Sequence, residues 1–294
     1  MNATAQVEYE SRVRLRYGAI AFAAALLLVG SQLLQLAGPH ASVQELTLDL
    51  IVANKRSTLD LLGAVCDTLG LLCVGVLLNW LFQVTRARNP GMRQIVRWLA
   101  TVGAGVAAVM ALIYTIIVAT KAHDFVTSGT QGYPQASALT SSSGLAVLQL
   151  LLQLGILLLT LGCIWTSLNA MRVGLLTRMV GYVGVVAGAL FLFPIGALVP
   201  VIQGYWLAAV AVTLAARWPS GDPPAWAAGV AVAPAPVGNA GQRQQATRGT
   251  RAQRRRVSTQ EVLAAVEPQN ENGAPRTDAP SPSTSAGKRK RKRK

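Results

Sequence analysis

Residues 179–216 have the sequence MVGYVGVVAGALFLFPIGALVPVIQGYWLAAVAVTLAA, a run without one charged side chain. The run is too long for one membrane-spanning helix of about 20 residues and short for two. Proline lacks the amide donor of a helix and its ring clashes with the preceding turn, so Pro194 and Pro200 favour a break near the centre. We predict a tight hairpin between spans over residues 179–194 and 200–216; one kinked span is the alternative.

Four further apolar runs precede this one, each about long enough to cross the hydrocarbon of a bilayer. They cover residues 17–37, 59–82, 98–120 and 145–168. The arginines before the first run are typical of a signal peptide, but this run continues to Ala37 without a clear A-x-A cleavage site, which favours a retained span. The sequence therefore predicts an all-α integral membrane helical bundle of six transmembrane helices.

Loop charges choose the orientation of these spans, because short loops rich in Lys and Arg stay in the cytoplasm. Residues 1–16 and the loops 83–97 and 169–178 fall on one side and hold nine arginines. The opposite side holds only Lys55, Arg56 and Lys121. We predict a plasma-membrane protein with both termini in the cytoplasm. Five spans would place the basic C-terminal end outside, so six are favoured.

Two loops on the predicted outer side have local signals. Ser42 and Glu45 have the spacing of a capping box, which predicts a short surface helix over residues 43–54. Residues 123–143 are rich in Ser, Thr and Gly and predict an irregular loop. Aromatic rings favour membrane interfaces. We assign Tyr17, Trp80, Trp98, Trp165, Tyr182 and Trp218 to the cytoplasmic interface, and Tyr205 and Trp206 to the outer one.

The composition changes after residue 216. Residues 217–294 are rich in Pro, Ala, Gly and Gln and lack the apolar content of a folded domain, which predicts a disordered cytoplasmic tail. Its basic clusters are Arg254, Arg255, Arg256 and the terminal run Lys288, Arg289, Lys290, Arg291, Lys292, Arg293 and Lys294. Each basic residue near an anionic leaflet contributes about 1 kcal/mol. We predict contact with anionic lipid headgroups; a ribosome or nucleic acid is the alternative partner, and a role in topology and solubility alone is the third.

Ionisable and amide side chains inside spans are the main candidates for function, because they are costly in hydrocarbon. Asp67 lies inside the second span, with Asp60 on the same helical face. Gln149 and Gln153 share a face of the fourth span. These residues predict a polar intramembrane site around Asp67, Gln149 and Gln153. The alternative is that they form hydrogen bonds between packed helices.

Motifs of soluble enzymes are missing from the sequence: it has no P-loop, no G-x-S-x-G, no H-E-x-x-H and no metal-ligand spacing. We therefore name no catalytic residue, no cofactor and no metal site, and leave enzymatic activity as the less favoured class. Small residues recur at packing distance in two spans, which predicts close helix contacts inside the bundle or in a homo-oligomer. They are Gly103, Ala107 and Ala111, and Gly181, Gly184 and Gly188.

The string RWPSGDPPAW occupies residues 217–226. It resembles an RWPxGxPPAW-like motif that follows the last span of actinobacterial-type integral membrane proteins of unknown function. Residues 10–226 are also similar to a broader bacterial family with a basic hairpin loop and a late Gly-rich span after an Asn/Arg turn, here residues 169–188. The resemblance implies a multi-pass membrane location and implies no activity.

Two functional hypotheses follow. The first is a non-enzymatic structural or interaction role, in which the polybasic tail contacts anionic lipid or another acidic partner. The second is a small transporter or sensor that uses the polar site around Asp67.

Overall fold

The computed structural model describes residues 3–38, 45–128, 130–193, 198–219 and 221–232, and all regular structure in these ranges is helical. The predicted all-α class is confirmed. The helices are α1 (Ala3–Ala37), α2 (Leu46–Arg88), α3 (Ile95–Thr127), α4 (Tyr133–Thr140), α5 (Ser143–Arg172), α6 (Arg178–Leu192), α7 (Leu198–Leu214) and α8 (Pro224–Ala228). The predicted disordered tail, residues 217–294, is wrong in its first part, because residues 221–232 include α8 and bury Ala225 and Trp226 against the bundle. Arg254–Arg256 and Lys288–Lys294 lie outside the described residues.

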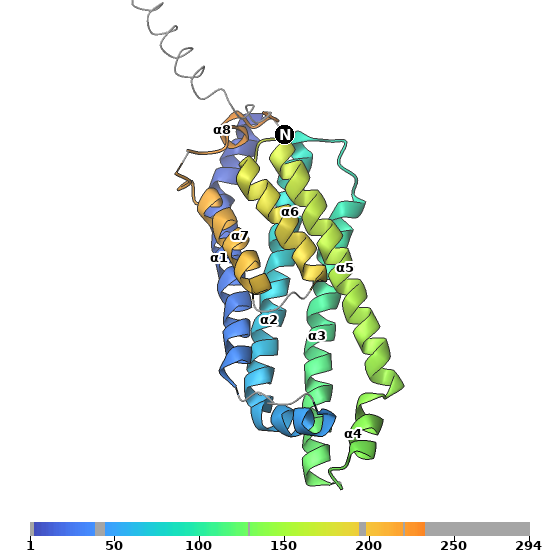
Figure 1. Ribbon diagram of the computed structural model, residues 1–294. Coiled ribbons are helices and arrows are strands. Elements are labelled where there is room, and N and C mark those ends of the chain that lie inside the picture. The colour runs from blue at the N-terminus through green and yellow to red at the C-terminus, as the bar shows by residue number, and fades with distance from the viewer. Residues whose placement is uncertain (1–2, 39–44, 129, 194–197, 220, 233–294) are drawn as a thin grey trace, which may run out of the picture. The chain divides into compact units, whose positions relative to one another are not determined.

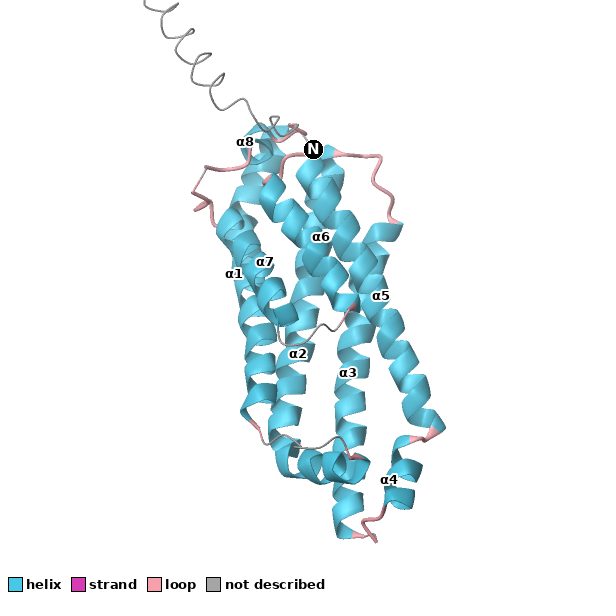
Figure 2. Ribbon diagram, in the orientation of Figure 1, coloured by secondary structure: helices cyan, strands magenta, loops and turns pink. Residues whose placement is uncertain are grey.

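Helices α1, α2, α3 and α5 are long and apolar enough to cross a membrane. They fit the predicted membrane protein, and each contains one of the first four predicted spans. Neighbouring helices in the bundle follow the order α1, α2, α3, α5, α6, α7, and α7 packs back against α1. Figures 1 and 2 show this bundle with the N-terminus and α8 at one end and α4 at the other.

The apolar run that follows α5 forms two shorter helices, α6 and α7. At 1.5 Å per residue they are about 22 and 26 Å long. The indole of Trp206 on α7 lies beside Gly184 on α6, whereas one continuous helix would separate these residues by about 33 Å. The chain therefore turns back between α6 and α7, and a single kinked helix is wrong.

Of the two predictions about the outer loops, the first is confirmed in part and the second is wrong. Residues 46–54 of the helix expected over residues 43–54 are helical, but they form the first turns of α2, which continues from Leu46 into the apolar run. Ser42 lies outside the described residues. The loop expected over residues 123–143 is largely helical: α3 continues to Thr127, and α4 begins with Pro134 in its first turn, where no amide donor is needed.

Burial explains the helical structure of that region. Ala136 of α4 packs with Phe125 and Ala122 of α3 and with Leu50 of α2, in a small apolar cluster. Composition alone did not reveal these contacts, because they join segments far apart in the sequence.

Close contact between α3 and α5 depends on glycine. A Cβ atom on Gly103 would overlap the backbone of Leu158 and Leu159, and one on Gly155 would lie 2.6 Å from the amide nitrogen of Ala107. Gly162 approaches Ala100 in the same way. The predicted small-residue packing is confirmed, and it is used inside one copy of the chain.

The α6 glycines face the neighbouring helices. Gly181 lies against Met171, and Gly184 lies against both Ser167 and Trp206. Trp206 is 1% exposed, so its assignment to an outer aromatic belt is wrong. Because Gly184 has no side chain, α6 leaves room for the indole at this position.

The arginine-rich end of the bundle is closed by the segment that follows α7. We call this closure the end clamp and define it by Glu10, Arg14, Arg88, Asp222 and Trp226. Arg88 forms a bidentate ion pair with Glu10, at 2.8 and 2.6 Å, and both side chains are almost fully buried. Arg88 also donates to the carbonyl oxygen of Ala225, so the clamp joins α2, α1 and α8.

Trp226 is the centre of the end clamp. Its indole stacks on Trp80, with the ring centroids 5.9 Å apart, and Trp80 stacks on Tyr17 at 4.3 Å. The guanidinium groups of Arg14 and Arg88 lie 4.5 and 5.5 Å from its ring, a favourable arrangement of cation and ring. Trp80 is therefore buried under the clamp, although the sequence pattern assigned it to an interface belt.

Further polar contacts hold the segment in place. Arg14 forms a bidentate pair with Asp222, with both distances 3.1 Å, and also donates to the carbonyl oxygen of Thr213. Trp226 donates its indole N–H to the carbonyl oxygen of Leu175 at 2.9 Å. The backbone of Val232 binds that of Val173. The segment is thus anchored on α1 through Arg14 and on the loop before α6 through Leu175 and Val173.

Gly174 in that loop has φ of 79° and faces the carbonyl group of Val232. A side chain there would be strained in the left-handed region and would also collide with that carbonyl. The loop can receive the C-terminal segment only with glycine at this position.

The first prediction concerns the α3–α5 contact. We expect Gly103→Leu to destabilise the bundle, because an added side chain has no space against the α5 backbone, and overpacking costs about 1–3 kcal/mol. Gly105→Leu is the matched control, since its Cβ would meet nothing within 4 Å. Thermal unfolding of the purified protein in detergent measures the difference; equal melting temperatures for the two variants would contradict the packing.

The second prediction concerns the end clamp. Glu10→Gln leaves the Arg88 charge buried without its carboxylate, and breaking a buried pair in this way costs about 3–5 kcal/mol. Glu8→Gln is the control, because Glu8 pairs with Arg12 at the surface, with side chains 65% and 75% exposed, where a pair contributes about 1 kcal/mol or less. We expect a large loss of stability in the first variant alone. A similar small loss in both would show that the Arg88 pair does not hold the clamp.

Candidate functional site

A polar pocket lies between α2, α3 and the end of α1, near the end of the bundle that carries α4. Its volume is about 730 Å³. We call it the α2–α3 pocket. Its lining residues are Gln35 of α1; Asp49, Val52, Ala53, Arg56, Ser57, Asp60, Ala64 and Asp67 of α2; and Ala111, Tyr114, Thr115, Val118 and Ala119 of α3.

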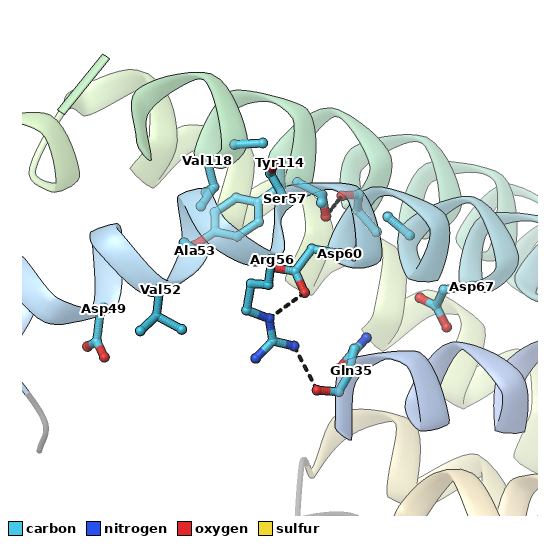
Figure 3. Close-up of a pocket in the computed structure, with 14 residues that line it drawn as sticks. Gln35, Asp49, Val52, Ala53, Arg56, Ser57, Asp60, Asp67, Tyr114 and Val118 are labelled. Carbon is cyan, nitrogen blue, oxygen red and sulfur yellow. Dashed lines mark hydrogen bonds and ion pairs between the residues drawn. The ribbon is translucent and has the colours of Figure 1, made fainter. Parts of the chain in front are cut away.

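The continuous α2 helix places its ionisable groups along one wall. Asp49, Arg56, Asp60 and Asp67 are separated by seven, four and seven residues, and these intervals are close to whole turns of 3.6 residues. Figure 3 shows the carboxyl groups of Asp60 and Asp67 and the guanidinium of Arg56 on the same side of the helix. The predicted shared face of Asp60 and Asp67 is confirmed.

Arg56 connects the α2 wall of the pocket with α1. It donates to the carboxylate of Asp60 at 2.9 Å and to the backbone carbonyl of Gln35 at 2.7 Å. Both members of the ion pair are largely buried, with side chains 15% and 27% exposed. The ion pair neutralises one of the three pocket carboxylates, and the hydrogen bond from Arg56 to Gln35 joins α2 to α1 at this level.

Asp67 is the deepest ionisable residue of the wall. The part of the chain that the structure describes offers its carboxylate no hydrogen-bond or ion-pair partner. The next residue, Thr68, instead donates to the carbonyl oxygen of Ala108 on α3. A carboxylate inside an apolar helix is costly unless water, a proton or a bound group compensates it. The pocket is where such a compensating group has room.

Close helix contacts lie beyond Asp67 on the way to the end clamp. A Cβ on Gly70 would lie 2.8 Å from the Leu28 side chain, and one on Gly75 would lie 2.7 Å from Ala104. The buried side chains of Val74, Leu77 and Leu78 follow. The α2–α3 pocket is therefore bounded by packed helix on the clamp side of Asp67.

The three residues predicted as one polar site are divided by the structure. Asp67 lines the α2–α3 pocket, whereas Gln149 lines an adjacent pocket of about 400 Å³ that shares Asp49 and Tyr114 with it. Gln153 is exposed and lines neither. The reason is that α5 packs mainly on α3, so its glutamines do not share a cavity with Asp67.

The sequence pattern missed several pocket residues. Asp49 and Arg56 fell in a presumed surface helix and loop, so their register with Asp60 and Asp67 was hidden. The available signal was the spacing of seven and four residues across residues 49–67. Tyr114 and Thr115 gave no distinct signal, because single polar residues are common in spans.

The chemistry of the pocket is that of a polar binding site. It presents three carboxylates, one guanidinium, hydroxyl groups and one aromatic ring, together with apolar side chains. Among the residues that the structure describes, no group of three or more His, Cys, Asp and Glu side chains is placed so that it could hold a metal ion. The three cysteines are free, and Cys163 is buried.

Comparisons with protein-family models, with curated proteins and with solved structures found no match. The resemblance of residues 217–226 to a motif of actinobacterial membrane proteins stays a prediction.

Proposed function

We propose that the chain is a six-pass plasma-membrane protein with both termini in the cytoplasm, α6 and α7 being the fifth and sixth spans. The nine arginines of residues 1–16, 83–97 and 169–178 support this orientation, because positive loops stay inside. The two short helices fit a bilayer that thins locally to match them. The end clamp then faces the cytoplasm, and the α2–α3 pocket faces outward.

Within this topology, the chain acts as a small transporter or sensor that binds a polar solute from the outer side. One observation carries the proposal: a pocket of about 730 Å³ ends at Asp67, whose carboxylate has no partner among the described residues. Intramembrane ionisable residues that face a cavity commonly mark a substrate or ion site. A transporter or sensor needs only to bind and orient its solute, so the proposed function requires no enzymatic activity.

Thiol accessibility tests the pocket. In a variant without the three native cysteines, we expect Ala64→Cys to react with a membrane-impermeant thiol reagent added outside intact cells, because Ala64 lines the pocket. Val65→Cys is the control: it is next in sequence but its side chain is 41% exposed on the outer surface of the bundle, where lipid excludes the reagent. Equal labelling of both positions, or labelling of Ala64→Cys only from the cytoplasm, would refute the outward-facing pocket.

A second function, tethering through the basic tail, is favoured by the end clamp. The clamp anchors residues 221–232 at the arginine-rich end, and Val232 binds Val173 there. The rest of the predicted tail, residues 233–294, follows Val232 in the chain, so it is joined to the face that we place in the cytoplasm. Arg254–Arg256 and Lys288–Lys294 are then the groups that contact anionic headgroups, at about 1 kcal/mol each.

Deleting residues 287–294 tests the tether. Seven basic residues are lost, so we expect the protein in nanodiscs to lose most of its binding to vesicles that contain phosphatidylserine, and the binding of the intact chain to weaken as salt rises. Vesicles of phosphatidylcholine alone are the control. Unchanged binding of the shortened chain at low salt would exclude the tether, and stronger binding to RNA than to anionic vesicles would favour the nucleic-acid alternative.

A further inference from the structure

We infer that the α2–α3 pocket binds a small organic cation, with a protonated amine held by Asp67. This inference rests on the proposed binding function and adds the chemical class of the solute. It is drawn from the charge, the size and the walls of the pocket.

The charge of the pocket selects a cation. Its lining holds three carboxylates and one guanidinium, and the guanidinium of Arg56 is engaged by Asp60 and by the Gln35 carbonyl. Asp49 and Asp67 remain as acceptors of positive charge. A cavity with one dominant charge and low-dielectric walls concentrates ions of the opposite sign and repels anions.

The spacing of the carboxylates argues against a bare metal ion. Asp60 and Asp67 are seven residues apart and Asp49 is eleven residues before Asp60, so the rises along α2 are about 10 and 16 Å. Oxygen ligands of one Ca²⁺ must all lie within about 2.6 Å of it, which residues so distant along one helix cannot satisfy. Each carboxylate can instead hold a positive group alone, as an ammonium group requires.

The size of the pocket leads to the same class. About 730 Å³ is far more than the share of one water molecule, about 30 Å³, and falls in the range of about 300–1,000 Å³ typical of pockets for organic ligands. An alkylamine fits within such a volume and carries its charge at one end or at both.

The remaining walls suit the carbon skeleton of such a solute. Val52, Ala53 and Val118 provide apolar surface, and Ser57 and Thr115 provide hydroxyl groups. Figure 3 shows the ring of Tyr114 between α3 and the α2 wall. The ring lies at the level of Ala53 and Val118 and away from Asp67. The cation that it can stabilise, by about 0.5–2 kcal/mol, is therefore a second ammonium group of the solute, and a neutral or anionic isostere gains nothing from it.

Equilibrium binding of putrescine tests the inference. The full chain in nanodiscs of neutral lipid is titrated with labelled putrescine, and 1,4-butanediol and succinate serve as neutral and anionic isosteres. We expect saturable binding of one putrescine per chain, with both isosteres at least tenfold weaker. Asp67→Asn should weaken putrescine binding at least tenfold.

Two control variants show whether weaker binding is due to loss of the Asp67 charge. Asp124→Asn removes an exposed carboxylate of α3 outside the pocket and should change the affinity less than twofold. Asp67→Glu keeps the charge and should retain affinity within about fivefold, which separates loss of charge from loss of folding.

Three results would overturn the inference: no saturable putrescine binding, equal binding of 1,4-butanediol, or unchanged affinity in Asp67→Asn. Labelling of Ala64→Cys from outside is a separate result. If that labelling occurs and putrescine does not bind, the outward pocket stands and the amine class is wrong. If the labelling fails as well, the proposed binding function is also wrong.

Discussion

The ion pair between Arg88 and Glu10 is the contact on which the closed end of this protein depends. A buried guanidinium is stable only when its donors are satisfied, and Arg88 reaches Glu10 on α1, Val84 on its own helix and Ala225 on α8. Because these acceptors come from three segments, the pair requires all of them to be in position. The stacked rings of Tyr17, Trp80 and Trp226 add apolar burial around the same charge.

The helices pack tightly at one end of the bundle and enclose a pocket at the other. Near the clamp, α6 and α7 complete the ring of helices, and glycines on α6 allow close contact with α5 and α7. Beyond Gly70 toward α4, the wall of α2 carries charged residues, and the helices enclose a pocket. One helix, α2, therefore belongs to both regions: its second half is packed core and its first half lines the pocket.

Hydropathy predicted the helical class and the approximate position of every long helix, because burial in hydrocarbon is a local property of each run. Helix ends were predicted less well. Leu46 continues into α2, and Tyr133 begins α4, through contacts with Phe125 and Leu50 that are distant in sequence. Such contacts have no local pattern, so composition indicated loops.

The candidate site was predicted in part for the same reason. Asp60 and Asp67 share a face because helical periodicity is fixed, and this was visible in the sequence. The grouping of Asp67 with Gln149 and Gln153 assumed that α5 faces α2. Glycine contacts between α3 and α5 instead place α5 mainly against α3, and the sequence pattern did not show these contacts. The role of Trp226 was also hidden, since its partners Trp80 and Arg14 are more than a hundred residues away.

The position of the clamp residues along the chain also sets an order of assembly. Glu10, Arg14 and Arg88 are synthesised early, whereas Asp222 and Trp226 follow the last helix. Until those residues leave the ribosome, Arg14 has no carboxylate to bind at this site and Trp80 has no ring above it. Closure of the bundle end therefore requires that every preceding helix has been synthesised.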